Sequence, residues 1–245
     1  MQEQAVDNRV FRTYPRCLWF LILSYSMVIV MANWFDPRLI QLFGITTDAG
    51  TLIFPFTFLL SDLITEVYGY KHARRAIWCG FLFNAIFILY GQIVIHLPSP
   101  SYETLNSQFD LLLKADTRII FASVISYVCA EPLNSVIMAQ MKIWTQGRYM
   151  GLRFMTSTLI AAGVDSTIFG TLAFYGLMSN YNLAMLILGM WAIKVGIEFI
   201  GLPISLRIAR KFKQIEQLDV YDEKTKFKVF SLETNYQQDA NHYRG

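Results

Sequence analysis

Six long apolar stretches constrain the fold of this chain more than any other feature of its sequence. At 1.5 Å per residue, each is long enough to cross about 30 Å of hydrocarbon as a helix. With 54% hydrophobic and 16% charged residues, the 245-residue chain also lies outside the composition of a soluble globular domain. We therefore predict an all-α membrane protein with six transmembrane helices. The predicted spans are Cys17–Phe35, Gly50–Tyr68, Ala76–Leu97, Ile119–Met141, Arg153–Met178 and Leu183–Leu206.

The distribution of Lys and Arg predicts the orientation of these spans. Basic residues collect before the first span, in the loops after the second and fourth spans, and after the sixth span. The loop between the fifth and sixth spans carries no charge. Because cytoplasmic loops are enriched in Lys and Arg, we expect both termini to face the cytoplasm. The basic residues are Arg9, Arg12, Arg16, Lys71, Arg74, Arg75, Lys142, Arg148, Arg153, Arg207, Arg210, Lys211 and Lys213.

Three parts follow from this pattern. Residues 1–16 form a polar cytoplasmic arm, residues 17–208 a six-helix transmembrane transport domain, and residues 209–245 a cytoplasmic tail that we expect to be partly disordered at its end. The letters TLI are followed by YG at the same distance in both halves of the membrane domain, from Thr51 and from Thr158. This repetition suggests two inverted three-helix repeats, an arrangement common in transporters.

Six ionisable residues lie inside the predicted spans. A charge at the centre of a bilayer costs roughly 2.5–3.5 kcal/mol on insertion scales unless it is paired or hydrated. Such residues must therefore converge on one another or on water. Four of them, Asp62, Glu131, Asp165 and Lys194, lie near the middle of their spans, and Glu66 and Glu198 each lie one turn closer to the predicted cytoplasmic side.

Five carboxylates face one lysine, so we expect some of these acids to hold a proton. Asp62, Asp165 and Glu66 are the candidates for proton coupling. Two structural alternatives stay open. Lys194 and Glu198 could form an ion pair within their own helix, and Glu66 could pair with a basic residue of the following loop, Lys71 or Arg75.

Prolines and catalytic motifs bear on what such a cluster could do. Pro55, Pro132 and Pro203 lie in three of the spans, and we expect broken helices beside the buried charges.

The chain has no phosphate-binding loop, no HExxH and no GxSxG motif, and its three cysteines are far apart. We therefore expect neither an enzyme nor a metal or cofactor site.

Four segments of the sequence resemble a known family, the queuosine precursor transporters, also called the vitamin uptake transporter family. The segments are FPFTFLLSDLITEVYG at 54–69, TSTLIAAGVDSTIF at 156–169, IKVGIEFIGLP at 193–203 and DVYDEKTKF at 219–227. The resemblance implies six helices and uptake of 7-cyano-7-deazaguanine, 7-aminomethyl-7-deazaguanine or both across the cell inner membrane. It also implies site roles, which fall on Asn33, Asp62, Asp165, Lys194 and Glu198.

The fourth span departs from the family pattern. Where the resemblance leads us to expect Gln followed three residues later by Asp, this chain has Glu131 and Asn134. The polar groups are kept but the charge is exchanged between the two positions. A guanine-like edge offers two adjacent N–H donors that one carboxylate could accept, and Asp62, Asp165 or Glu131 could supply that carboxylate.

Three hypotheses about function follow. The first is a secondary importer of a deazapurine base, coupled to protons. The second is a substrate-binding subunit of an energy-coupling-factor importer, which would need ATPase and scaffold subunits as partners. The third is an intramembrane enzyme or a scaffold. In each case we expect contact with the lipid bilayer and none with nucleic acid, and the chain could form a homo-oligomer.

Overall fold

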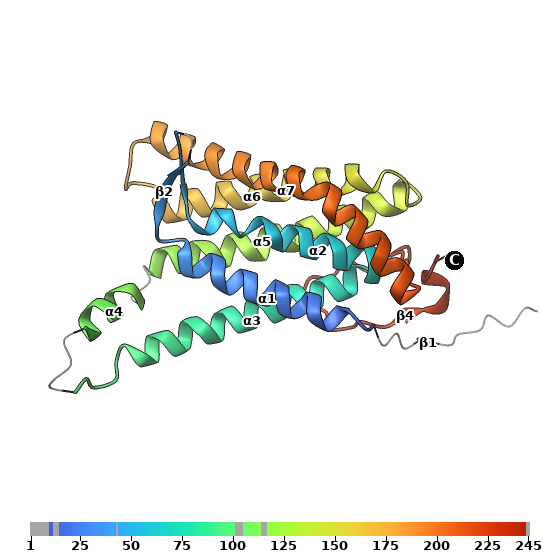
Figure 1. Cartoon of the computed structure of the whole chain (residues 1–245), viewed down its shortest axis with the longest axis horizontal. Coiled ribbons are helices and arrows are strands. Elements are labelled where there is room, and N and C mark those ends of the chain that lie inside the picture. Colours follow the sequence, from blue (N-terminus) through green and yellow to red (C-terminus); the bar gives the residue numbers. More distant parts are fainter. Residues whose placement is uncertain (1–9, 12–14, 43, 101–104, 114–116, 244–245) are drawn as a thin grey trace, which may run out of the picture.

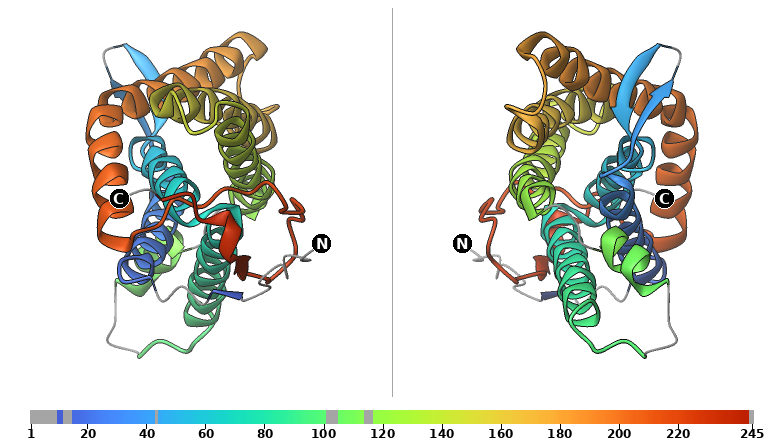
Figure 2. Two further views of the ribbon diagram at one scale, coloured as in Figure 1. Left: turned by 90° about the vertical axis from the view of Figure 1, so that its right-hand side faces the viewer. Right: turned by 90° about the vertical axis from the view of Figure 1, so that its left-hand side faces the viewer.

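The computed structural model describes residues 10–11, 15–42, 44–100, 105–113 and 117–243. Six helical spans in these residues run side by side in one bundle (Figures 1 and 2), and each is long and apolar enough to cross a membrane. The second span is the stretch Gly50–Tyr68, which extends helix α2 (Pro55–Tyr68) at its beginning. The prediction of an all-α membrane fold with six spans is confirmed. The helices are α1 (Leu18–Phe35), α2 (Pro55–Tyr68), α3 (Tyr70–Val94), α5 (Thr117–Trp144), α6 (Met150–Phe174) and α7 (Asn180–Glu216).

Short elements mark the two ends of the bundle. Between α1 and α2, strands β2 (Leu39–Leu42) and β3 (Ile45–Asp48) form an antiparallel hairpin, followed by the short helix η1 (Gly50–Leu52). At the other end, β1 (Val10–Phe11) pairs antiparallel with β4 (Tyr236–Gln237), which precedes η2 (Gln238–Ala240). We call these the hairpin end and the terminal end (Figure 1). Helix α4 (Asn106–Leu113) lies in the long connection between α3 and α5.

Helix boundaries differ from the sequence prediction at the terminal end. Helix α3 begins at Tyr70, so the basic residues expected in a loop lie in its first turns. Gly69 alone separates α2 from α3, with φ of 86°, in the left-handed region that glycine adopts without a steric penalty. Helix α7 continues to Glu216, well beyond the predicted end of the span at Leu206.

The expectation of helices broken at proline is wrong for two of the three prolines. Pro132 and Pro203 lie inside the continuous helices α5 and α7. Both helices pack along α6, and neighbouring helices can compensate the backbone groups that a proline frees. The predicted span 50–68 is interrupted before Pro55, because η1 ends at Leu52 and Pro55 is the first residue of α2, a position where the absence of an N–H costs nothing.

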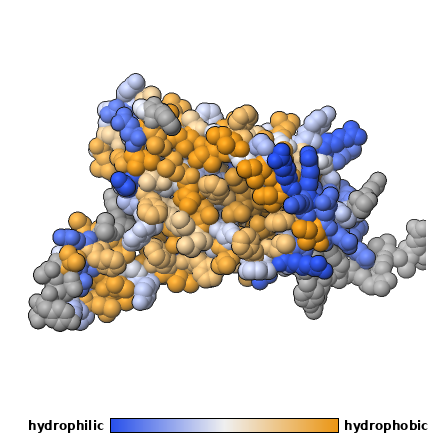
Figure 3. Space-filling view, in the orientation of Figure 1, coloured by the Kyte–Doolittle hydropathy of each residue, from blue (hydrophilic) through white to orange (hydrophobic). Residues whose placement is uncertain are grey.

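The bundle has an apolar exterior and a polar interior. Hydrophobic side chains cover the middle of the face in Figure 3, and hydrophilic ones gather at the terminal end. Helix α2 belongs to the innermost span. Of the most apolar 18 residues of that span, 78% are buried, whereas the corresponding share for α3 is 17%. The motif with Asp62 and Glu66 therefore lies where other helices surround it, rather than against lipid.

Candidate functional site

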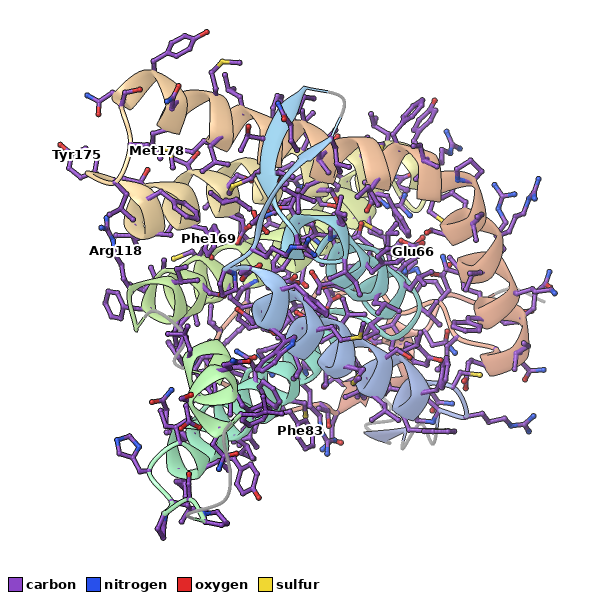
Figure 4. All side chains as sticks on the ribbon, turned by 60° about the vertical axis from the view of Figure 1, so that its left-hand side comes forward. Glu66, Phe83, Arg118, Phe169, Tyr175 and Met178 are labelled. Carbon is purple, nitrogen blue, oxygen red and sulfur yellow. The ribbon has the colours of Figure 1, made fainter. Side chains whose placement is uncertain are left out.

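The ionisable residues predicted in the spans are all buried. They form two groups at different depths. A central group contains Asp62, Glu131, Asp165, Lys194 and Glu198, contributed by α2, α5, α6 and α7. Glu66 belongs to a second group, nearer the terminal end. Figure 4 shows Glu66 on α2, away from the hairpin end, where Arg118 lies beside Tyr175.

Asp62 is held by neutral donors from two neighbouring helices. One carboxylate oxygen accepts a hydrogen bond from Asn134 Nδ2 of α5 at 2.7 Å. The other accepts from Ser157 Oγ of α6 at 3.3 Å. Among the described residues, no lysine or arginine forms an ion pair with Asp62. Within those residues, this buried carboxyl group is therefore stabilised only by hydrogen bonds from neutral side chains.

Glu131 faces α2 from the middle of α5. One of its oxygens accepts a hydrogen bond from Thr57 Oγ1 at 2.5 Å, and one turn further the hydroxyls of Ser61 and Ser135 are 2.9 Å apart. Within the described ranges, the second oxygen of Glu131 and the side-chain oxygen of Asn134 are buried without a hydrogen bond of normal geometry, although the Tyr25 hydroxyl also interacts with Glu131. The interface of α2 and α5 therefore offers two acceptors that lack such a bond.

Lys194 pairs with Asp165 across the interface of α7 and α6. Its Nζ also lies 4.6 Å from the ring centroid of Phe54. Glu198, one turn further along α7, is fully buried, and neither of its oxygens has a hydrogen-bond partner in the part of the chain that the structure describes. The alternative of an ion pair between Lys194 and Glu198 is therefore wrong, because Asp165 on the neighbouring helix takes the lysine.

The second group surrounds Glu66 with three cations. Arg153 Nη2 lies 2.9 and 2.8 Å from its two oxygens. Lys213 Nζ is at 2.5 Å and Lys142 Nζ at 3.9 Å. Glu66 thus pairs with basic residues, as one alternative proposed, but these come from α5, α6 and α7. Lys71, one of the two partners expected, instead binds Glu233 of the C-terminal segment.

Asn33 lies apart from the central group. Its Nδ2 donates to Ile29 O at 3.0 Å, and its Oδ1 accepts from Ser123 Oγ. With Asn84 and Gln92 it lines a cavity of about 50 Å³ between α1, α3 and α5. That volume holds one or two waters, not a purine-sized ligand.

Two acidic residues at the hairpin end escaped the sequence analysis. Asp48 accepts from both the backbone N and the Oγ1 of Thr51 at 2.6 Å. The carboxylate of Asp36 lies against Gly50, where any Cβ would overlap it. Burial, together with the charge of Asp48, raises the pKa of Asp36 well above its ordinary value. The available signal in the sequence was that both acids lie just outside predicted spans, Asp36 directly after Phe35 and Asp48 shortly before Gly50. Thr57, which binds Glu131, was also missed although it lies inside the α2 motif.

The described residues contain no group of three or more His, Cys, Asp or Glu side chains that could hold a metal ion. What the central group offers is a set of acceptors and one cation. Carboxylate oxygens without partners can accept N–H or O–H donors, and the ammonium of Lys194 has donors beyond the one that it gives to Asp165. Such a set suits a small polar molecule that carries both donors and acceptors.

Residues 48–208 match the family described as "Putative vitamin uptake transporter". This range contains every residue of the central group. No solved structure matches the chain.

Three relatives carry names that agree with this family. A "Probable queuosine precursor transporter" of Bacillus subtilis is 26% identical over 76% of this chain and 81% of its own length. A protein of the same name from Haemophilus influenzae is 30% identical over 54% of each chain. The "Queuosine precursor transporter" of Escherichia coli is 27% identical over 65% of this chain and 70% of its own. The chain belongs to the vitamin uptake transporter family.

Proposed function

We propose that this protein imports queuosine precursors, 7-cyano-7-deazaguanine or 7-aminomethyl-7-deazaguanine, across the cell inner membrane by secondary transport, with both termini in the cytoplasm. The observation that carries the proposal is the central group of buried carboxylates with unused oxygens. Buried acceptors are nearly always paired in folded proteins. A ligand that brings several N–H donors would pair the oxygens of Glu131 and Glu198.

The free acceptors indicate how such a ligand could bind. Both oxygens of Glu198 lack partners, so this carboxylate can accept two adjacent N–H groups, as the guanine edge of a deazaguanine presents. Glu131 and Asn134 each have one further acceptor. Lys194 can donate to the ring carbonyl while it keeps its pair with Asp165. Asn33 stands outside this binding mode.

We assign proton coupling to Asp62 in the first place and to Asp165 in the second. Asp62 is held only by neutral groups, so gain or loss of a proton there breaks no ion pair. Asp165 would exchange its proton in competition with Lys194. Glu66 was a third candidate, but its three cationic partners favour a structural role.

Uptake by the purified chain in proteoliposomes tests this proposal. We expect radiolabelled 7-aminomethyl-7-deazaguanine to accumulate when an inward proton gradient is imposed, and accumulation to stop when the gradient is collapsed. Glu198→Gln should abolish uptake, whereas Asp239→Asn, which removes an exposed ion pair with Lys224, should not.

Other outcomes point elsewhere. Uptake indifferent to the gradient would remove the proton coupling. Binding without uptake by the purified chain, with uptake restored by a co-purifying ATPase, would favour the substrate-binding subunit of an energy-coupling-factor importer. Full uptake by Glu198→Gln would refute the binding mode.

A further inference from the structure

The C-terminal segment Gln217–Tyr243 lies across the terminal end of the bundle, over the junction of α2 and α3. The backbone N of Val220 donates to Val67 O at 3.3 Å. Asp222 accepts from the backbone N of Tyr70 at 2.9 Å and from the hydroxyl of Tyr236 at 2.7 Å. The tail, which we expected to be partly disordered at its end, is thus bound to the membrane domain through its DVYD sequence.

Further contacts hold this segment along the first turns of α3. Arg74 donates to the carbonyls of Lys228 and Glu233 at 2.7 and 2.6 Å. Trp78 Nε1 donates to Val229 O at 2.7 Å. The basic residues that the sequence analysis placed in a loop are therefore used to hold the C-terminal segment.

The junction itself is shaped to receive the segment. A Cβ on Gly69 would lie 2.8 Å from Val220 Cγ1 and would overlap the hydroxyl of Tyr236. Cβ atoms in proteins essentially never approach other atoms so closely, so only glycine at position 69 allows the segment to pack against the junction of α2 and α3.

The segment also enters the ion cluster around Glu66. Asp219 lies 2.6 Å from Lys142 Nζ and 2.8 Å from Lys213 Nζ. Lys142 Nζ in turn donates to the carbonyls of Glu66 and Val220 at 2.5 and 2.8 Å. We call Glu66, Lys142, Arg153, Lys213 and Asp219 the gate cluster.

Four members of the gate cluster come from α2, α5, α6 and α7, the same four helices that carry the central group. Three cations face two carboxylates, and one of these, Asp219, belongs to the C-terminal segment. Without Asp219, three cations, of which Lys142 and Arg153 are buried, would share Glu66 alone. Like charges in a poorly solvated site repel strongly, so the cluster would separate.

We propose that the segment Gln217–Tyr243 is the latch of a gate at the terminal end. With Asp219 in the gate cluster the four helices are held together and the central group is closed to that end. When the segment leaves, the cluster opens and the site gains access to that end in each transport cycle. This proposal rests on the proposed function, because a gate matters only if the central group binds a transported molecule.

Cysteine labelling tests the latch without any substrate. Ser135 is fully buried between Asn134 and the gate cluster on α5. Ser135→Cys is introduced with Cys17, Cys79 and Cys129 replaced by alanine, and inside-out vesicles are exposed to a membrane-impermeant methanethiosulfonate. We expect slow labelling, accelerated on the order of tenfold or more by Asp219→Asn.

Two variants serve as controls for this labelling. Asp239→Asn removes an exposed pair with Lys224 from the same segment and should leave the rate unchanged. Asp219→Glu keeps the charge and should restore slow labelling. If Asp219→Asn labels no faster than its parent, or if Asp239→Asn accelerates labelling equally, the latch is refuted.

A crosslink gives a second test that does not depend on a destabilising variant. Lys71→Cys and Glu233→Cys replace an ion pair between α3 and the segment. Bridging them with a short bifunctional methanethiosulfonate should stop uptake while equilibrium binding of 7-aminomethyl-7-deazaguanine persists, and reduction should restore uptake. Full uptake by the bridged protein overturns the latch. Absence of ligand binding before bridging would refute the proposed function instead, and the labelling result would still decide the gate.

Discussion

Lys194 forms its ion pair with Asp165 on the neighbouring helix, although Glu198 lies one turn away on its own helix. The pair joins α6 to α7 at the level of the candidate site. It also leaves Glu198 as a buried acid whose oxygens have no partner. The arrangement separates a fixed pair, which orients the site, from a free carboxylate that is available to a ligand.

Breaking this pair should destabilise the protein. Asp165→Asn leaves a buried lysine without its counter-charge, which typically costs about 3–5 kcal/mol of unfolding free energy. The double variant Asp165→Asn, Lys194→Met removes both charges and should recover most of the stability but no uptake. Thermal unfolding in detergent and uptake measure the two effects. A double variant as unstable as the single one would contradict the pairing.

The two donors to Asp62 should differ in importance. Asn134→Ala removes a hydrogen bond of 2.7 Å, whereas Ser157 is 3.3 Å away and also donates to Phe154 O. Hydrogen bonds to charged groups contribute about 1.5–3 kcal/mol. We expect Asn134→Ala to lower both stability and uptake clearly and Ser157→Ala to change them little. Equal effects would contradict the stronger dependence of Asp62 on its partner in α5.

Asp36 should make stability depend on pH. Burial, and then the charge of Asp48, raise its pKa, so the folded protein holds this proton to higher pH than an unfolded chain does. The resulting stabilisation is complete below the unfolded pKa of about 3.9 and is lost as the pH rises toward the folded pKa. Asparagine cannot ionise. The melting temperature of Asp36→Asn minus that of the parent should therefore rise as the pH increases above the unfolded pKa of about 3.9. A constant difference would contradict the raised pKa.

Gly69→Ala should displace the C-terminal segment. The added methyl group would collide with Tyr236 and Val220. Gly176→Ala is a matched control, because Gly176 has φ of 83°, close to the 86° of Gly69, but a Cβ there meets no atom within 4 Å. Both variants carry backbone strain, and only the first should make the segment sensitive to a protease added at the terminal end. Equal sensitivity would mean that the segment is not seated on the junction.

Much of this architecture is predictable because a bilayer demands long apolar helices. The six spans and the convergence of Asp165 and Lys194 on one level both follow from the cost of a charge in hydrocarbon. The residue with which Lys194 forms its ion pair was less predictable. Periodicity places Lys194 and Glu198 on one face of a helix but does not say which residue of the neighbouring helix lies closer.

The terminal end could not be predicted for a different reason. A polar tail after the last span is typical of a solvated segment, and only its contacts in the folded structure, such as those with Gly69 and Tyr70, show otherwise. The same holds for Glu66, whose partners Arg153 and Lys213 lie far away in sequence. The β2–β3 hairpin was also unforeseen, because its few residues carry neither a long alternating pattern nor an Asn-Gly turn.

Equilibrium binding of 7-aminomethyl-7-deazaguanine to the purified protein and to Glu198→Gln decides whether Glu198 holds the ligand. A buried acceptor of two N–H donors should contribute strongly, so we predict saturable binding that falls on the order of 100-fold in the variant. A folded Glu198→Gln variant that binds as tightly as its parent would show that this carboxylate does not hold the ligand.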